Sequence, residues 1–420
     1  MHSLRTVGQI VSIEMWVPLS VALVTLGSLT LSLTWQMLTH VRLLRRPSPP
    51  SAGNLPPISI LKPIKGVSAG LWDNLRAIAL QSYPNFELVI GIQSPRDPAV
   101  QLVRTFMAEH PEVRILLHVG GPARGLNPKV NNLKNMLALA QHQYLLISDA
   151  DVRPGPNYLR TIAREATAPG VGLVHSLLVS TGERRLGALL ESVQMNTWVA
   201  AAVCGADQAG HSCVIGKSIL LRRSVLELLG GFKRVQDVLA EDYLLGKLVR
   251  DAGYEVRLST YPLPTACPDR RLAEFLNRHL RWAQMRRWIA PGTYFLELFA
   301  NPICWLVLCV GLSLLMAPGA LTNWPGELGA LALLTVITKC VGDELVARQL
   351  RREGLGLAGL LLIPLKDLLV GALWVIGAAR RTVAWRGTYM WIGPESSLHP
   401  LPGAQEADFL VEPHGWVDER

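Results

Sequence analysis

The middle of the chain carries short acidic motifs whose residue types and spacing could perform chemistry. Asp149 and Asp151 flank one alanine directly after the apolar run 144–148, so their carboxylates could reach one divalent cation. Asp242, in Ala-Glu-Asp-Tyr at 240–243, opens a predicted helix and could act as a general base toward an acceptor hydroxyl. Taken alone, the first motif is also typical of a solvated turn, and the second of acidic residues at a helix N-terminus.

A basic motif follows near residue 280. Arg278 and Arg281 are three residues apart on a predicted helix and so share a face that could bind phosphate, with Trp282 beside them. A basic face on anionic lipid is the alternative. Asp97 follows a predicted strand and could accept a hydrogen bond from a uracil imide, although a loop aspartate is also a common turn former. A sugar-nucleotide transferase needs a residue that recognises the nucleobase, metal ligands, a general base and positive charges that bind the diphosphate. These motifs together could supply all four.

Other candidate residues carry weaker signals. Lys129 and Asn131 stand near a predicted helix start, in Asn-Pro-Lys-Val-Asn-Asn at 127–132, where Lys129 could meet a phosphate or simply be a surface lysine. His175 lies in an apolar strand and is more typical of a satisfied core histidine than of a catalytic one. The six cysteines form no CxxC pair and no metal-ligating spacing, which favours reduced, buried thiols.

The elements that must position these residues alternate between strands and helices. Predicted strands cover 58–61, 87–92, 113–118, 144–148 and 171–178, and predicted helices cover 71–81, 99–109, 130–140 and 158–166. This order predicts an α/β, Rossmann-like and mostly parallel sheet in a catalytic domain over 58–270. Ligands of such sheets bind beyond the carboxyl ends of the strands, and Asp97 and Asp149 both fall just past such ends.

The composition points to a membrane surface. Hydrophobic residues make up 50% of the 420 residues, and the net charge of +9 suits a phosphate-bearing substrate or anionic lipid better than nucleic acid, for which no signature is present. The apolar run 16–38 can span a bilayer and predicts a retained anchor within 1–46, followed by a Pro- and Ser-rich linker over 47–57. Arg42, Arg45 and Arg46 follow the run and predict a cytoplasmic catalytic domain.

The C-terminal third is predicted to return to the membrane. Residues 271–297 favour an amphipathic interfacial helix that carries the arginine motif, and apolar tracts follow at 298–321, 328–346 and 355–379. Pro364, Lys366 and Asp367 lie within the last tract, and arginine clusters flank it, so we expect a re-entrant helix broken at Pro364 rather than a simple crossing. Residues 380–420 are predicted to be a cytosolic tail, and no protein partner is predicted.

Together these motifs resemble the family-2-like, lipid-directed glycosyltransferases with a GT-A fold. More closely, the chain is similar to the ceramide glucosyltransferase (glucosylceramide synthase) family in a bacterial form, over about residues 57–288. The resemblance is carried by Ile-Leu-Lys-Pro-Ile-Lys-Gly at 60–66, Asn-Pro-Lys-Val-Asn-Asn-Leu at 127–133, Val-Gly-Leu-Val-His at 171–175, Ala-Glu-Asp-Tyr at 240–243 and Arg-His-Leu-Arg-Trp at 278–282. One departure is Met-Asn-Thr-Trp-Val at 195–199, where the eukaryotic members carry a histidine.

The resemblance implies inverting transfer of glucose from UDP-glucose to the primary hydroxyl of ceramide, aided by Mg²⁺ or Mn²⁺, on the cytosolic face of a bacterial inner membrane. It implies uridine binding by Asp97, metal and diphosphate binding by Asp149 and Asp151, base catalysis by Asp242, and active-site closure by Arg278, Arg281 and Trp282. Lys62, Lys129 and Asn131 are further candidates for binding the donor. A hopanoid or other lipid acceptor and a UDP-N-acetylglucosamine donor are alternatives. A membrane protein that only binds a nucleotide is a more distant one.

Overall fold

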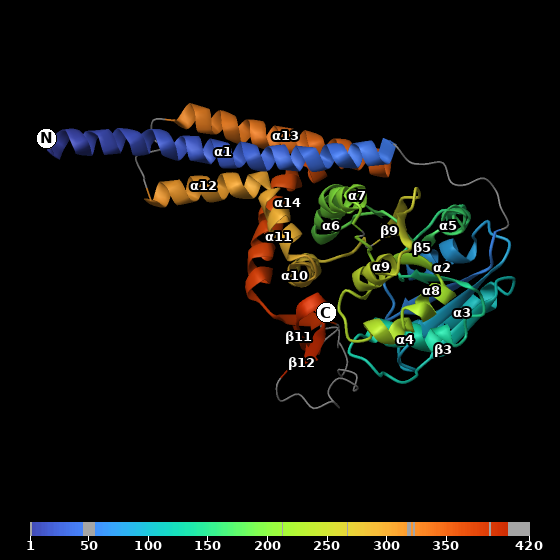
Figure 1. Cartoon of the computed structure of the whole chain (residues 1–420). Coiled ribbons are helices and arrows are strands. Elements are labelled where there is room, and N and C mark those ends of the chain that lie inside the picture. The colour runs from blue at the N-terminus through green and yellow to red at the C-terminus, as the bar shows by residue number, and fades with distance from the viewer. Residues whose placement is uncertain are drawn as a thin grey trace.

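The computed structural model describes residues 2–44, 55–211, 213–266, 268–316, 321, 324–385 and 388–401, with side chains described from Trp16 onward. It consists of an α/β domain and a group of long helices contributed by both ends of the chain (Figure 1). Most of the linker predicted over 47–57 and the end of the tail, residues 402–420, lie outside the described residues.

Long helices from distant parts of the sequence pack into one bundle. α1 (His2–Leu44) lies beside α12 (Pro302–Met316) and α13 (Pro325–Arg351) (Figure 1). Within the described residues, two helical segments are long and apolar enough to cross a membrane, Trp16–Leu44 of α1 and α14 (Gly356–Ala379). α11 (Pro291–Phe299) and α12, which meet at a bend of 72°, would form a third span if counted together.

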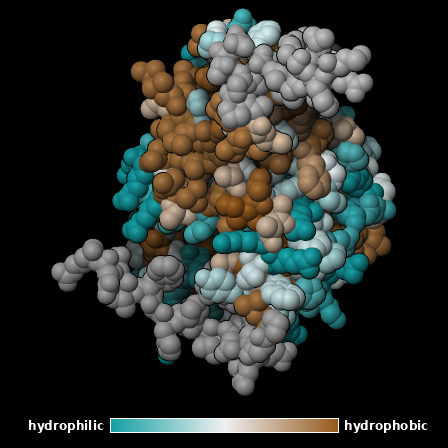
Figure 2. All heavy atoms as spheres, turned by 90° about the vertical axis from the view of Figure 1, so that its left-hand side faces the viewer, coloured by the Kyte–Doolittle hydropathy of each residue, from teal (hydrophilic) through white to brown (hydrophobic). Residues whose placement is uncertain are grey.

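The bundle leaves a large apolar surface exposed. Figure 2 shows hydrophobic residues gathered over the upper part of one face and hydrophilic residues beside and below them. Leu308, Leu312 and Leu315 of α12 and Leu357 and Leu361 of α14 are among the exposed apolar side chains. Such a surface is typical of a membrane contact.

The α/β domain is built on a seven-stranded sheet in the order β3-β2-β1-β4-β7-β5-β8. The strands are β1 (Ile58–Ile64), β2 (Phe86–Ile92), β3 (Ile115–Val119), β4 (Tyr144–Ser148), β5 (Val171–His175), β7 (Ser218–Arg222) and β8 (Glu255–Leu258). β3, β2, β1 and β4 are parallel, whereas β7 runs antiparallel to both of its neighbours, β4 and β5. The predicted mostly parallel α/β sheet is therefore confirmed, with one reversed strand that the sequence pattern did not predict.

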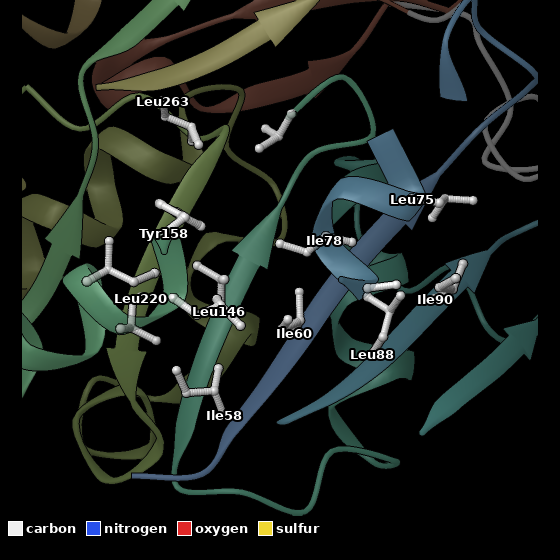
Figure 3. Packing of buried hydrophobic residues seen from close by; sticks show 14 of the residues in the cluster. Ile58, Ile60, Leu75, Ile78, Leu88, Ile90, Leu146, Tyr158, Leu220 and Leu263 are labelled. Atoms are coloured by element: carbon white, nitrogen blue, oxygen red, sulfur yellow. The ribbon is translucent and has the colours of Figure 1, made fainter. Parts of the chain in front are cut away.

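Both faces of the sheet are buried, which explains the nearly continuous apolar strands. On one face, Ile58 and Ile60 of β1 pack with Leu75 and Ile78 of α2 (Leu71–Ala79) (Figure 3). On the other face, Leu61 of β1 belongs to a second core. The remaining helices of this domain are α3 (Ala99–Glu109), α4 (Pro128–Leu137), α5 (Tyr158–Ala166), α6 (Leu186–Gln194), α7 (Ala200–Gln208), α8 (Arg223–Leu228) and α9 (Glu241–Asp251); the π-helix Met195–Val199 joins α6 to α7, and β6 (Leu178–Thr181) pairs with β9 (Leu263–Ala266).

The break predicted at Pro364 is absent, because α14 continues through this proline as one helix. Lys366 and Asp367 do not interrupt it either: they are buried and form an ion pair with each other, and Asp367 also pairs with Lys339 of α13. Neighbouring helices can compensate for a proline inside such a helix. One of the charges that suggested a break instead forms an ion pair between α13 and α14.

The segment expected as one interfacial helix over 271–297 is divided. α10 (Leu272–Ile289) ends before Pro291, which begins α11. Phe275, His279 and Ala283 of α10 are buried, and the helix packs against α6 and α14. The arginine motif thus sits between the α/β domain and the helical bundle.

The described part of the predicted tail is folded. β10 (Thr382–Trp385), β11 (Thr388–Ile392) and β12 (Leu398–Pro400) form a three-stranded antiparallel sheet that follows α14 directly. Its buried Val383, Met390 and Leu398 form a cluster with Leu239 of the α/β domain. The end of the chain therefore returns to the segment that precedes Asp242.

Candidate functional site

The Asp149–Asp151 turn lies at the carboxyl end of β4 and is fixed by three lysines. Lys129 Nζ lies 2.9 Å from Asp149 Oδ1, and Lys217 pairs with Asp151. Lys62 is fully buried beneath the turn, where its Nζ donates to the Asp149 carbonyl at 2.8 Å. Burial lowers the pKa of Lys62 to about 8, against the opposing effect of the Asp149 and Asp151 carboxylates. Lys62 thus supports the turn, and its contact with a donor stays a prediction.

Lys129 links this turn to the predicted base motif. Besides Asp149, its Nζ lies 3.1 Å from Glu241 Oε1 and donates to the Gly216 carbonyl at 2.8 Å. Burial alone would lower the pKa of Lys129, but the carboxylates of Asp149, Glu241 and Asp242 raise it above its ordinary value. The lysine is therefore a fixed positive charge between two acidic motifs that are far apart in the sequence.

Asp242 is the second residue of α9 and is held by two backbone N–H groups. Gly216 N donates to its Oδ2, and Tyr243 N donates to its Oδ1 at 2.8 Å. A Cβ atom at position 216 would lie 2.7 Å from Asp242 Oδ2, so only glycine fits there. Burial and the Glu241 carboxylate raise the pKa of Asp242 to about 7, although Lys129 and the backbone donors oppose this shift. A carboxylate with this pKa suits general-base chemistry near neutral pH.

Asp97 and Asn131 both hold loops at the sheet edge. Asp97 accepts hydrogen bonds from Gly66 N and Ala99 N, each at 2.8 Å, and thereby joins the end of β1 to the start of α3. Asn131 accepts from Gly125 N at 2.9 Å and donates to the Gly125 carbonyl at 2.7 Å. These bonds fix the two loops, and nucleotide contacts by either residue stay predictions.

Arg278 and Arg281 line a polar cavity of about 560 Å³ together with Asp151. Ser68, Asp269 and Asn277 also line it. The cavity joins the first acidic motif to the arginine motif and is large enough for part of a nucleotide diphosphate. The guanidinium of Arg278 also lies 4.6 Å from the centre of the Trp282 ring, which orients it.

Trp282 instead lines a second cavity, of about 110 Å³, whose walls are mostly apolar. Asp242 lies on its wall, and Arg286 and Glu297 form an ion pair there. Further lining residues come from the π-helix, α7, the Cys213–Ile215 segment, α10 and α14: Trp198, Val199, Ala202, Val203, Val214, Met285, Ile289 and Trp374. The helix α10 thus carries the arginines of the polar cavity and the tryptophan of the apolar one.

Glu191 of α6 is a site residue that the sequence reasoning missed. It is buried and lies 2.8 Å from Arg270, 3.3 Å from Arg278 and 2.9 Å from His279. Burial alone would raise the pKa of Glu191, but Arg278, His279 and Arg270 hold it well below its ordinary value. A single acid within the otherwise apolar run Leu-Gly-Ala-Leu-Leu-Glu-Ser-Val at 186–193 was the available signal. Glu191 positions the arginine motif against α6.

The two carboxylates of the Asp149 turn are the candidate metal ligands. Across the described ranges no group of three or more His, Cys, Asp or Glu side chains is placed to hold an ion. Mg²⁺ is usually bound through one or two carboxylates plus substrate phosphates, and Asp151 lines the polar cavity that also contains the arginines. The oxygen donors at this turn fit that mode, in which a cation would replace Lys129 and Lys217 as the partner of the carboxylates.

Comparison with solved structures supports the fold. A mannosyltransferase from Pyrobaculum calidifontis, solved in complex with GDP-mannose and Mn²⁺, matches with a TM-score of 0.50 at 20% identity. The match covers 86% of this chain and 97% of that protein. The predicted glycosyltransferase fold is thereby confirmed.

Comparison with curated sequences finds ceramide glucosyltransferases. The chain is 27% identical to ceramide glucosyltransferase 1 of Caenorhabditis elegans over 266 residues, which cover 63% of this chain and 56% of that protein. It is 22% identical to a ceramide glucosyltransferase of Pyricularia oryzae over 454 residues, which cover 86% and 90%. In the two Caenorhabditis relatives the match spans little more than half of their length, 56% and 53%.

The match to a family model shows to which family the chain belongs. The model of glycosyl transferase family 21 matches residues 18–398, which include both acidic motifs, the arginine motif and the helical bundle. The predicted resemblance to ceramide glucosyltransferases is therefore confirmed. The chain belongs to glycosyl transferase family 21.

Proposed function

We propose that the protein is a membrane-bound, inverting glycosyltransferase that moves glucose from UDP-glucose to the primary hydroxyl of ceramide, on the cytosolic face of the membrane. The observation that carries this proposal is the position of Asp242. It lies on the wall of an apolar cavity whose other walls come partly from α10 and α14, while the arginines of α10 line a polar cavity with Asp151.

The polar cavity supports binding of the donor. Arg278 and Arg281 offer guanidinium groups for diphosphate oxygens, and Asp149 and Asp151 offer carboxylates for a cation. A Mg²⁺ or Mn²⁺ ion bound there would neutralise negative charge on the departing UDP. Glu191 holds Arg278 in place, so this guanidinium is already positioned before the donor binds.

The apolar cavity supports a lipid acceptor. Its aromatic and aliphatic walls suit alkyl chains, and α14, which contributes Trp374, is one of the helices apolar enough to cross a membrane. A lipid could therefore enter from the bilayer and present its hydroxyl to Asp242 without leaving the membrane surface.

Asp242 would act in a single displacement. Its carboxylate accepts the proton of the acceptor hydroxyl as that oxygen bonds to the anomeric carbon of glucose, and the bond from this carbon to the UDP oxygen breaks. The attack comes from the face opposite the leaving UDP, so the anomeric configuration inverts. Arg278 and Arg281 stabilise the charge that develops on UDP.

The proposed orientation in the membrane, with the α/β domain in the cytosol, rests on basic residues at the end of the bundle that contacts this domain. Arg42, near the end of α1, pairs with Asp207 of the α/β domain, and Arg351, at the end of α13, lies 3.1 Å from Glu183. Basic residues favour the cytoplasmic side of a membrane. In a bacterium this membrane is the inner one.

Product analysis with purified protein tests the proposal. The protein is incubated with UDP-glucose, UDP-galactose or UDP-N-acetylglucosamine and with ceramide or a hopanoid, and the products are identified by mass spectrometry. We expect glucosylceramide, with UDP release that depends on added lipid. A glycosylated hopanoid would mean that the acceptor is not ceramide, and an N-acetylglucosaminyl product would mean that the donor is not UDP-glucose. UDP-sugar binding without lipid-dependent UDP release would indicate a binding protein.

The metal is tested in the same assay. EDTA should abolish transfer, and Mg²⁺ or Mn²⁺ in excess should restore it, because the two aspartates supply too few ligands to retain an ion against a chelator. Undiminished turnover in EDTA would contradict the role given to Asp149 and Asp151.

A further inference from the structure

A third, smaller cavity adjoins the apolar one that Asp242 lines. Four residues line both, Gln194, Trp198, Glu297 and Trp374. Asn301 and Asp367 line only the smaller cavity. The smaller cavity thus adds the polar side chains of Asn301 and Asp367 next to these four shared residues.

Two buried polar atoms at this boundary have no hydrogen-bond partner among the described residues. They are Gln194 Oε1, an acceptor, and Trp374 Nε1, a donor. The two residues are only 1% and 6% exposed. Leaving such atoms unpaired is costly, and native proteins rarely do so without a partner of another kind.

The Trp374 side chain is held by a neighbouring ring, and Gln194 lies at an unusual point of the backbone. The Tyr294 ring stacks on the Trp374 indole with 5.7 Å between ring centres, and the Tyr294 hydroxyl donates to the Trp374 carbonyl. Gln194 is the last residue of α6 and directly precedes the π-helix Met195–Val199, and π-helical turns are frequent at functional sites.

We propose that Gln194 and Trp374 bind the amide of an N-acylated lipid acceptor and so decide which lipid is glycosylated. An amide supplies a donor for Gln194 Oε1 and an acceptor for Trp374 Nε1 within one planar group. A lipid alcohol without an amide would leave both atoms unpaired, and such sites strongly discriminate against ligands that lack the matching group. The inference rests on the proposed lipid acceptor and adds the residues that recognise it.

The two contacts are separable with three lipids of identical chains, in which an amide, an ester or an ether joins the acyl chain. The ester lacks the N–H that Gln194 requires but keeps the carbonyl that Trp374 requires, and the ether lacks both. We therefore expect wild-type kcat/KM to fall by about tenfold at each step from amide to ester to ether.

Each variant should abolish one of these two tenfold differences in kcat/KM. Gln194→Met should make the amide and the ester equivalent while keeping the difference between ester and ether. Trp374→Phe should make the ester and the ether equivalent while keeping the difference between amide and ester. Trp198→Phe is the matched control, since Trp198 lines both cavities but its Nε1 is not among the unpaired buried atoms, and it should preserve both steps.

The outcomes separate this inference from the proposed function. Wild-type protein that glycosylates none of the three lipids would contradict the proposed function. Wild-type protein that glycosylates all three with equal kcat/KM would overturn the inference without any variant. Equal losses on all three lipids in Gln194→Met or Trp374→Phe, with UDP-glucose binding intact, would overturn it too.

Discussion

Asp242 is surrounded by groups that both restrain it and keep its proton affinity high. Two backbone donors fix the carboxylate, while burial and Glu241 raise its pKa to about 7. We expect Asp242→Asn to reduce transfer by roughly 10²–10⁴-fold, because the amide cannot accept the acceptor's proton. UDP-glucose binding, measured by calorimetry, should be nearly unchanged, since the arginines line the other cavity. Normal turnover in this variant would exclude Asp242 as the base.

The charges around Asp242 also predict how activity depends on pH. A base works only when deprotonated, so kcat/KM should rise as the pH increases through about 7. Glu241 raises the pKa of Asp242 and Lys129 lowers it. Glu241→Gln should therefore move the midpoint of the pH profile down, and Lys129→Met should move it up.

Measurements of kcat/KM between pH 5 and 9 for the wild type, Glu241→Gln and Lys129→Met check these two shifts. The two variants are controls for each other, because each removes one charge from the same cluster. Midpoints that shift in the same direction, or a wild-type profile that is flat across this range, would contradict the assignment of the titrating group.

At the scale of elements, the C-terminal sheet acts on the segment that leads into Asp242. The Ser396 carbonyl accepts a hydrogen bond from Leu239 N at 2.9 Å, and the Ser396 Oγ accepts one from Ala240 N at 3.0 Å. Leu398 N donates to the Asp237 carbonyl at 2.7 Å. Because the sheet follows α14 directly, this apolar helix and the predicted base are connected through these three bonds.

Removing one of these bonds should weaken the connection. Ser396→Ala leaves Ala240 N buried without an acceptor, so we expect a loss of about 1–3 kcal/mol in stability and a lower kcat. Ser397→Ala is the control, because the Ser397 hydroxyl forms an exposed hydrogen bond with His399, 3.0 Å away. Thermal unfolding and kcat of both variants provide the check, and equal behaviour of the two would contradict a specific role for Ser396.

The same elements show what the sequence could predict. The parallel strands β1, β2 and β4 were predictable because strands buried on both faces are almost continuously apolar. β7 was not predicted: Ser-Ile-Leu-Leu-Arg at 218–222 is short, and its place between β4 and β5 depends on long-range pairing that periodicity does not encode. The C-terminal sheet was expected as a tail for the same reason.

Among the site residues, the order of the motifs along the chain was the informative signal. It predicted Asp151 and Arg278, which line the polar cavity, Asp242, which lines the apolar one, and Asp149, which Lys129 links to Glu241. The lysines were harder, because a sequence does not reveal whether a lysine meets a phosphate or a carboxylate. Lys62 and Lys129 are bound by the protein's own oxygens in this structure.

At the scale of the whole molecule, helices from the N-terminal and C-terminal parts of the chain form one bundle beside the α/β domain (Figure 1). Gln36 of α1 donates to Asp343 of α13 at 2.7 Å. Lys339 of α13 pairs with Asp343 and also lies 3.7 Å from Asp367 of α14, which pairs with Lys366. The charges of two buried lysines and two buried aspartates thus balance, and together with Gln36 these residues connect α1, α13 and α14.

A balanced cluster of buried charges is vulnerable to the loss of one member. Lys339→Met leaves Asp343 and Asp367 facing each other with Lys366 as the remaining cation, and we expect it to destabilise the bundle by about 3–5 kcal/mol. Lys339→Met combined with Asp343→Leu restores the balance and should recover much of this loss. Thermal unfolding of the detergent-purified protein measures both.

Arg348→Met provides the comparison for this test. Arg348 forms an exposed pair with Glu344 four residues earlier on the same α13 helix, and such pairs contribute only about 0–1 kcal/mol. A Lys339→Met variant as stable as Arg348→Met would mean that apolar packing alone holds the three helices together. A double variant less stable than Lys339→Met alone would mean instead that Asp343 stabilises the bundle through Gln36 rather than through charge. If the charge cluster does connect the helices, then the anchor at the start of the chain helps to hold α14 in place, and with it the sheet that supports Asp242.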